Sequence, residues 1–468
     1  MQGCLLGLAV IVFVTLFLTG CSLYHHPYDT TKSIVTSPAY DLRIVQVDDF
    51  GSLWDKRDAD NILTEVQVGS ESTNTIVVVF VHGWHHNADP TDDNLLSFKG
   101  ALQSLAKNLS EEKRQIARKD LSGSASVKVI GIYVGWRGRS LPSFFDYLTM
   151  WWRKDAAERV GDGDVSEFLE RLQRIYLRAN SYSRYAERSK RTPGDTPYMG
   201  LVTVGHSFGG QVVLKAVGRA IEGELVERAP CQTDAVTSPS IPSTPTVERV
   251  PIDSFGDLNI LINPALEAYQ FARIDELYRQ LSYPNTQSPQ LVVFSADNDS
   301  ARKMFFPIAR GLTRPFRPAF RNSYQGELWG KALGEMVSQQ THQLTLTSDA
   351  DSLSDADFAP DRRQVIADYD FASQTVFSKV KLSPLSGVQA IPNSPIAVVV
   401  THDDIIDGHS GIFRKGFEGF LSGYIAFIEA KRVMRRYANF KREDITNNVP
   451  LPEVICNQVA ASSNVGNL

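Results

Sequence analysis

The chain has 468 residues, of which 43% are hydrophobic and 22% are charged, and this is the composition of a globular protein. Intrinsic disorder, collagen and coiled coil are therefore excluded. The 48 basic and 53 acidic residues give a formal net charge of -5, so no summed positive field favours nucleic acid as a partner. The four cysteines are too few and too scattered for a disulfide framework or a zinc finger: Cys4, Cys21, Cys231 and Cys456.

The N-terminal segment differs from everything after it. Residues 5–18 form an apolar run without a charge, too short to span a bilayer comfortably, and small residues follow in Leu18-Thr19-Gly20-Cys21. This pattern predicts a secretory signal over residues 1–20. Its ending resembles the lipobox of bacterial lipoproteins, which implies that Cys21 is acylated and becomes the new N-terminus. Met1 is followed by no Lys or Arg before the apolar run, which departs from that pattern, so an uncleaved N-terminal anchor stays open.

Both alternatives tether the protein to a membrane through its N-terminus. Several acyl chains on Cys21 would hold the protein firmly, because each buried methylene contributes about 0.8 kcal/mol. We therefore expect a membrane-anchored lipoprotein of the cell envelope, on the periplasmic or outer-membrane side. After cleavage, Cys231 and Cys456 would be the remaining thiols, and an oxidising compartment would permit them to pair without requiring it.

A polar tether over residues 21–40 precedes a domain over residues 41–440, in which strand-length apolar runs alternate with helical patterns. The runs that predict buried strands are residues 76–81, 127–134, 201–204, 258–262, 291–294 and 396–400. Helical spacing occurs over residues 95–109 and 165–176. This alternation implies right-handed crossovers and an α/β fold with a mostly parallel central sheet covered by helices on both faces. Residues 43–47 and 62–68 predict further edge strands at the start.

A glycine-rich turn surrounds Ser207 in the segment Gly205-His206-Ser207-Phe208-Gly209. A β-branched strand runs into this turn and a helical pattern over residues 212–220 runs out of it. Glycine is needed at both positions two residues from the serine, because the turn strains the backbone and brings strand and helix too close for side chains. The pattern predicts a nucleophile elbow with Ser207 Oγ at the carboxyl edge of the sheet. A glycine turn carrying a helix N-cap serine is the alternative.

A serine nucleophile also needs donors for the oxyanion that develops on the substrate. The strand at residues 76–81 is followed by His82-Gly83-Trp84, and the glycine lets the backbone turn toward the nucleophile. We expect the amides of Trp84 and Phe208 to form the oxyanion hole. The loop also contains three histidines, His82, His85 and His86, which invite a metal interpretation. No carboxylate-rich spacing accompanies them, so no metal site is expected.

The chain contains nine histidines that are candidates for the general base. His25 and His26 lie in the tether, and three more lie on the expected oxyanion loop. His206 neighbours the nucleophile, but its side chain is expected to point away from Ser207. His342, His402 and His409 remain.

His409 is the preferred base. It lies in a glycine-flanked loop after the last strand and before an aromatic helix over residues 417–428. His402 follows that strand by two residues, which is too early to reach across the edge of the sheet. His342 lies within residues 301–395 and is expected to be a substrate-side or structural residue.

The third member of the site is a carboxylate that orients the imidazole and stabilises its protonated form. Two aspartates follow the strand at residues 291–294, and Asp299, farther from the strand end, has the greater reach. Asp297 remains a rival, or caps the next helix. The resulting order of Ser207, Asp299 and His409 is that of α/β-hydrolases.

Three segments bear on specificity. Residues 229–251 are rich in Pro, Ser and Thr and predict an exposed excursion. Residues 301–395 are longer than a crossover needs, so we expect an insertion on the catalytic face, before the last strand. Residues 144–152 are unusually aromatic, and three interpretations stay open for them: an acyl pocket, a contact with lipid, or a core helix under the insertion.

Two arginines near this segment, Arg137 and Arg139, have two alternative interpretations. They bind a substrate carboxylate or phosphate, or they anchor their loop through ion pairs. Residues 441–468 form a C-terminal tail.

Two motifs together resemble the α/β-hydrolase superfamily, in particular serine esterases and lipases. They are Val79-Phe80-Val81-His82-Gly83-Trp84 and Gly205-His206-Ser207-Phe208-Gly209-Gly210, within a resemblance that covers residues 75–300 and 395–430. The resemblance implies an acyl-enzyme formed on Ser207 from a carboxylic ester, with His409 as general base and then acid. The long insertion and the excursion rich in Pro, Ser and Thr depart from the pattern. Because cap and lid segments shape the acyl pocket in this superfamily, the substrate is left open.

The expected partners are a small-molecule or lipid ester and a membrane. No nucleotide loop, metal-ligand spacing or flavin fingerprint is present, so no cofactor is expected. A second hypothesis is a non-catalytic hydrolase-fold lipoprotein that acts as a binding or scaffold module, since a fold does not imply a function. An intact set of Ser, Asp and His argues against this second hypothesis.

Overall fold

The structure, a computed structural model, describes residues 26–117, 127–139, 150–181, 197–228, 251–284, 287–305, 319–347, 375–377, 379–388 and 390–443. The expected signal with Cys21, all four cysteines, residues 144–149 of the aromatic segment, residues 229–250 of the excursion and residues 444–468 of the tail lie outside these ranges. None of the helices described is long and apolar enough to cross a membrane.

The described chain is α/β, built on a mostly parallel sheet of 11 strands in the order β1-β2-β4-β3-β5-β6-β7-β11-β8-β10-β9. The strands are β1 (Val35–Thr36), β2 (Tyr40–Gln46), β3 (Asn74–Val81), β4 (Val127–Gly135), β5 (Met199–His206), β6 (Leu258–Ile262), β7 (Leu291–Ala296), β8 (His342–Leu346), β9 (Thr375–Phe377), β10 (Val380–Pro384) and β11 (Ile396–Thr401). All neighbours from β2 through β8 are parallel. At the two edges β1, β10 and β9 pair antiparallel.

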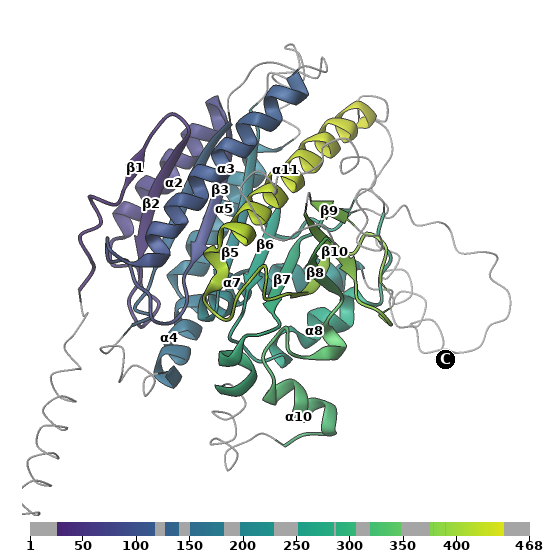
Figure 1. Cartoon of the computed structure of the whole chain (residues 1–468). Helices are drawn as coiled ribbons and strands as arrows, with labels where there is room; N and C mark the ends of the chain where they lie inside the picture. The colour runs from purple at the N-terminus through teal and green to yellow at the C-terminus, as the bar shows by residue number, and fades with distance from the viewer. Residues whose placement is uncertain are drawn as a thin grey trace, which may run out of the picture.

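Helices cover both faces of the sheet, and Figure 1 shows α3 and α11 side by side on one of them. The helices are α2 (Lys56–Ser72), α3 (Asp93–Ala117), α4 (Met150–Asp162), α5 (Asp164–Ala179), α7 (Phe208–Arg228), α8 (Tyr269–Tyr278), α10 (Ser323–Gly330) and α11 (Lys415–Glu443). Buried residues of α2, α4, α5, α7 and α8 share one core cluster, while those of α3 and α11 share the cluster on the opposite face.

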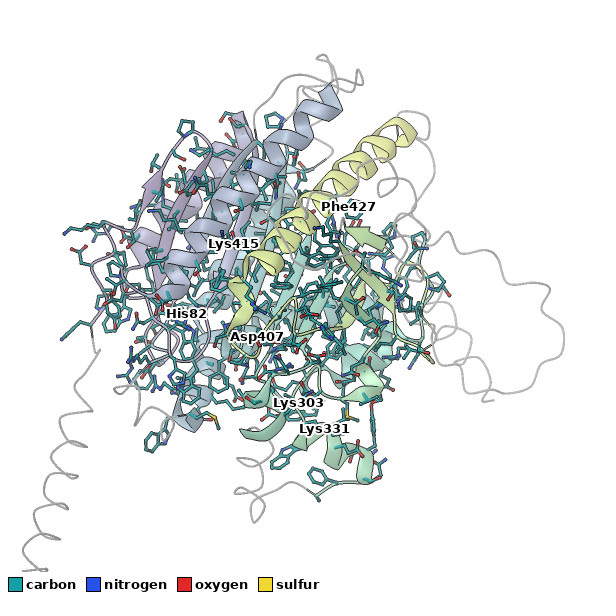
Figure 2. All side chains as sticks on the ribbon, in the orientation of Figure 1. His82, Lys303, Lys331, Asp407, Lys415 and Phe427 are labelled. Carbon is teal, nitrogen blue, oxygen red and sulfur yellow. The ribbon has the colours of Figure 1, made fainter. Side chains whose placement is uncertain are left out.

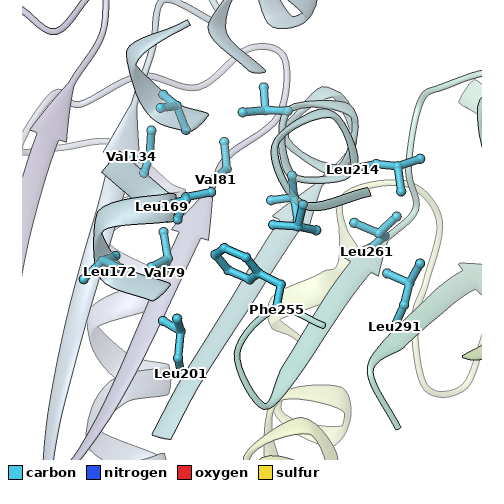
Figure 3. Close-up of a cluster of buried hydrophobic side chains, with 14 of the residues drawn as sticks. Val79, Val81, Val134, Leu169, Leu172, Leu201, Leu214, Phe255, Leu261 and Leu291 are labelled. Atoms are coloured by element: carbon cyan, nitrogen blue, oxygen red, sulfur yellow. The ribbon is translucent and has the colours of Figure 1, made fainter. Parts of the chain in front are cut away.

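The two cores follow from the alternation of side chains along each strand. In β3, Val77, Val79 and Val81 belong to the cluster that includes α5 and α7, part of which is drawn in Figure 3. Their neighbours Val78 and Phe80 belong to the cluster that includes α3 and α11. A strand buried on both faces needs apolar residues at every position, and this is why these strands are continuous apolar runs.

The six predicted core strands are confirmed, with β6 matching residues 258–262 and the other five extended at one or both ends. Residues 43–47 are confirmed in β2 and the bridge that follows it. The prediction of a strand at residues 62–68 is wrong, because these residues lie in α2. Ile62, Leu63 and Val66 are buried at helical spacing, and Asp55 caps the helix by accepting from the amides of Arg57 and Asp58.

Two parts of the chain join the sheet where none was predicted. Residues 301–395 contribute β8, β10 and β9, so β11 is the last strand in sequence but lies inside the sheet, between β7 and β8. Part of the expected tether also packs on the domain. Residues 35–36 form β1, and the side chain of Gln46 binds both the amide and the carbonyl of Tyr28, at 2.7 and 2.9 Å.

Candidate active site

The four strands that lead to candidate residues lie close together in the sheet: β3, β5, β7 and β11, with β6 between β5 and β7. β3, β5, β6, β7 and β11 are consecutive neighbours and all are parallel, so their carboxyl ends share one edge. The register aligns Val81 with Gly205 and Ala296 with Thr401. The loops that follow these strands carry the expected oxyanion donors, the serine, the aspartates and the histidine. Figure 2 labels His82 and Asp407 at this edge.

Ser207 lies between β5 and α7 with a φ of +56°, a left-handed conformation that is strained for a residue with a side chain. The turn is tightly enclosed: a Cβ on Gly205 would meet the backbone of Gly209, and one on Gly209 would meet the carbonyl of Val81. The amide of Ser207 donates to the carbonyl of Ile262 at 3.0 Å, and the residue is 3% exposed. The predicted strand, turn and helix around Ser207 are confirmed.

Three side chains from distant parts of the chain, those of Ser207, His409 and Asp299, are joined by hydrogen bonds, and this set is called the relay below. Ser207 Oγ lies 2.8 Å from His409 Nε2, and His409 Nδ1 lies 2.7 Å from Asp299 Oδ2. With the proton of the imidazole on Nδ1 and donated to Asp299, Nε2 is left to accept the hydroxyl proton of Ser207. Asp299 is fully buried and the side chain of His409 is 23% exposed. The arrangement can therefore deprotonate the hydroxyl as it attacks a bound electrophile.

Asp299 is kept ionised despite its burial. Burial alone would raise the pKa of this carboxyl, but the hydrogen bond and positive charge of His409, together with those of Arg302, outweigh it and hold the pKa well below its usual range. A permanently ionised carboxylate can stabilise the imidazolium that forms when His409 takes the serine proton.

The alternatives considered for the acid and the base lie elsewhere. The amide of Asp297 donates to the carbonyl of Thr401 at 2.9 Å, so its backbone links β7 to β11, and Asp299 is the carboxylate that meets the histidine. His402 is 48% exposed, with its Nδ1 at 2.9 Å from Asp403 and 3.0 Å from Asp404. His342 is the buried first residue of β8, where its Nδ1 lies 2.8 Å from Thr341 Oγ1.

His82, Gly83 and Trp84 follow β3 and lie against the elbow, as the oxyanion-loop hypothesis requires. A Cβ on Gly83 would lie 2.6 Å from the Cβ of Ser207, so glycine is required for this approach. The loop is held by His82, whose Nε2 accepts from the amide of Trp136 at 3.1 Å and whose carbonyl accepts from the indole of the same residue at 2.9 Å. Burial lowers the pKa of His82 to about 4, so the ring is neutral and accepts this bond.

The other residues of this region have structural partners. His86 Nδ1 lies 3.1 Å from Asp92 and its Nε2 accepts from Asn94 at 2.9 Å. Arg137 and Arg153 both bind the carboxylate of Asp49, so the ion-pair interpretation of Arg137 is confirmed. In the part of the chain that the structure describes, one group of side chains has the spacing to hold a metal ion, and it is the exposed set of His402, Asp403 and Asp404.

Two residues that the sequence analysis did not assign to the site hold the backbone around His409. Asn263, directly after β6, donates from Nδ2 to the carbonyls of Gly408 and His409 at 3.1 and 2.9 Å, and its Oδ1 accepts from the amide of Ala296 at 2.8 Å. It is fully buried with a φ of +45°. Its position just beyond a strand, at the edge of the sheet where Ser207 lies, is the signal that could have identified it.

His206 is the second of these residues. It was expected to point away from Ser207, and its Nε2 donates to the carbonyl of His409 at 2.9 Å. Burial and the nearby His409 lower the pKa of His206 well below its usual value, which keeps the ring neutral. The loop that carries His409 is thus held by hydrogen bonds from side chains at the ends of both β5 and β6.

A cavity of about 400 Å³ lies beside Trp136 and Arg137, on the β4 side of the loop of His82, Gly83 and Trp84. Aromatic rings and charged groups share its lining, including Phe50, Trp54 and Asp49. Gly138, next to Arg137, packs so closely on this loop that a Cβ would lie 2.6 Å from the carbonyl of Gly83. The volume of the cavity is within the range of small-molecule sites.

No family model, no curated protein and no solved structure matches this chain.

Proposed function

We propose that this protein is a serine hydrolase of the α/β-hydrolase fold that cleaves carboxylic esters through an acyl-enzyme on Ser207. The observation that carries the proposal is the relay of Ser207, His409 and Asp299, with 2.8 and 2.7 Å between successive polar atoms. The strained elbow and the parallel sheet support it, because they are the setting in which α/β-hydrolases present a nucleophile.

The reaction follows from the protonation states of the three groups. His409 Nε2 takes the proton of Ser207 as Oγ attacks the ester carbonyl, and the amides of Trp84 and Phe208 would receive the oxyanion. The imidazolium, stabilised by Asp299, then gives its proton to the departing alcohol. A water molecule then attacks the acyl carbonyl while the same imidazole takes one of its protons. The imidazolium gives that proton to Ser207 Oγ as the bond between Oγ and the acyl group breaks, and the carboxylic acid is released.

A fluorophosphonate probe tests the proposal directly, because it forms a covalent bond only with an activated serine. The wild-type protein is expected to be labelled, and Ser207→Ala and His409→Gln should abolish labelling. Two matched controls are provided by the chain: His402→Gln and Asp297→Asn should be labelled as wild type, whereas Asp299→Asn should react far more slowly. A folded wild-type protein that is not labelled would favour the alternative of a non-catalytic binding module.

The substrate class is addressed by comparing p-nitrophenyl esters of short and long acyl chains. We propose that the enzyme works at a membrane surface in the bacterial cell envelope, since the apolar run at residues 5–18 and the following Cys21 resemble a lipoprotein signal. Cys21→Ser should then either move the protein from the membrane fraction to the soluble fraction or leave its N-terminal signal uncleaved. An unchanged mature form in the membrane fraction would contradict acylation at Cys21.

A further inference from the structure

The carboxylate of the relay has a second cationic partner besides His409. Asp299 Oδ2 accepts from His409 Nδ1 at 2.7 Å and from Arg302 Nε at 2.6 Å. The other oxygen, Oδ1, accepts from the backbone amide of Arg302 at 3.1 Å. Both side chains are buried, with Asp299 at 0% and Arg302 at 1% exposure. One carboxylate oxygen is therefore shared between the imidazole and a permanently charged guanidinium.

The guanidinium is enclosed by a segment of the insertion. Arg302 Nη1 donates to the carbonyl of Leu333 at 3.1 Å, and Nη2 donates to the carbonyl of Ala296 at the same distance. Nη2 also lies 3.1 Å from Glu335 Oε1. Glycine is required at position 334, because its φ is +91° and a Cβ there would lie 2.5 Å from Ser295 Oγ and 3.0 Å from Arg302 Nη1. The insertion thus contacts the group behind the acid of the relay.

His206 also faces His409, with 5.2 Å between the ring centroids, but it is neutral. The charges of Asp299, Arg302 and Glu335 act on His409 in opposite directions. An ionised Asp299 stabilises the imidazolium, the positive charge of Arg302 opposes that effect, and an ionised Glu335 compensates Arg302. Burial raises the pKa of Glu335, although Arg302 and Lys303 favour its ionised form, and Asp299 disfavours it. Lys331 also favours the ionised form of Glu335, more weakly than Arg302 and Lys303 do.

We infer that Arg302 and Glu335 are positioning residues that together set how strongly Asp299 stabilises the protonated form of His409. The inference rests on the proposed function, since it concerns the proton acceptor of that reaction. A salt bridge that only stabilised the fold would not change the pH at which His409 becomes an effective base. The inference requires Arg302 and Glu335 to have opposite effects on that pH.

The test is the pH dependence of kcat/KM for p-nitrophenyl butyrate in two single variants. Arg302→Met removes the opposing charge, so the imidazolium is stabilised and the acid-side midpoint of the profile should rise by roughly 0.5–1 pH unit. Glu335→Gln leaves Arg302 uncompensated, and the midpoint should fall by about the same amount. Glu327→Gln is the matched control, because this exposed glutamate of the same insertion pairs with Lys331 and should leave the profile unchanged.

Opposite shifts support the inference. It is overturned if both variants lose activity with an unchanged midpoint, or if both midpoints move in the same direction. Should Arg302→Met fail to fold, Glu335→Gln still decides, because an unchanged midpoint in that near-isosteric variant contradicts the inference.

The same comparison is made without turnover by following the ring proton resonances of His409 during a pH titration, assigned with His409→Gln. If the wild-type protein hydrolyses no ester and is not labelled by fluorophosphonate, the proposed function fails. The titration still shows whether Arg302 and Glu335 shift the histidine in opposite directions, so the two failures are distinguishable.

Discussion

Asn263 donates a hydrogen bond of 2.9 Å to the backbone carbonyl of His409, although the two residues are 146 positions apart in the chain. The same side chain accepts from the amide of Ala296, at the end of the strand that leads to Asp299. One buried amide therefore connects the loop that carries His409 to the strand that leads to Asp299. In the proposed reaction, such a connection would fix the distance between His409 and Asp299.

Asn263→Asp tests this connection with almost no change in shape. The carboxylate keeps the acceptor for Ala296 and tolerates the positive φ, but it cannot donate to the carbonyls of Gly408 and His409. Loss of two buried hydrogen bonds, at about 1 kcal/mol each, should lower kcat by roughly 10- to 100-fold with little change in KM. The measurement is steady-state hydrolysis of an activated ester.

Asn180→Asp is the control for this prediction. Asn180 bonds both the amide and the carbonyl of Met199 at the opposite end of β5, so this variant should lose some thermal stability and keep its kcat. Equal loss of kcat in both variants would show that the effect of Asn263 is a general destabilisation.

Gly83→Ala should inactivate the protein through a steric conflict. The new methyl group would lie 2.6 Å from the Cβ of Ser207 and 3.0 Å from the carbonyl of His206, so the oxyanion loop or the elbow must shift. We expect a loss of about 1–3 kcal/mol in the free energy of unfolding and strongly reduced labelling of Ser207.

Gly100→Ala is the matched substitution in α3, where a Cβ would meet nothing within 4 Å. Removal of a helical glycine should there raise the stability by about 1 kcal/mol and leave labelling at the wild-type level. Wild-type labelling in Gly83→Ala would exclude the expected approach of this loop to the nucleophile.

His82 should make the stability of the protein fall at mildly acidic pH. Its pKa is lowered by burial from the ordinary value of 6.5 to about 4, so the unfolded state binds a proton that the folded state does not. The stabilisation associated with the neutral ring is fully present above pH 6.5 and is lost as the pH falls toward 4. A shift of this size corresponds to about 3 kcal/mol.

Urea unfolding of wild type and His82→Gln across this pH range measures the effect. The variant is less stable at pH 7.5, because the bond to the amide of Trp136 is weakened, but its stability should fall less steeply with acidification. Parallel pH dependences in the two proteins would show that His82 is not the group responsible. His402→Gln controls for the removal of an exposed histidine.

Several features of this protein were predictable from local sequence. Continuous β-branched runs identify doubly buried strands because such strands need apolar residues on both faces, and β6 was placed without error at residues 258–262. The elbow was predictable because its glycines are required by contacts within one turn around Ser207. By contrast, residues 62–68 were misassigned, since a short apolar run satisfies the patterns of strand and helix alike.

Tertiary structure decided everything that depends on residues distant in sequence. Asp297 and Asp299 are both acidic and two positions apart, and only the turn after β7, with Arg302 folded back on it, places the second against His409. The strands β8, β9 and β10 require partners from other segments, so their own residues did not reveal them. The identity of the candidate reactive groups is thus a property of short segments, whereas their distances and charges are set by long-range packing and hydrogen bonds that no local pattern records.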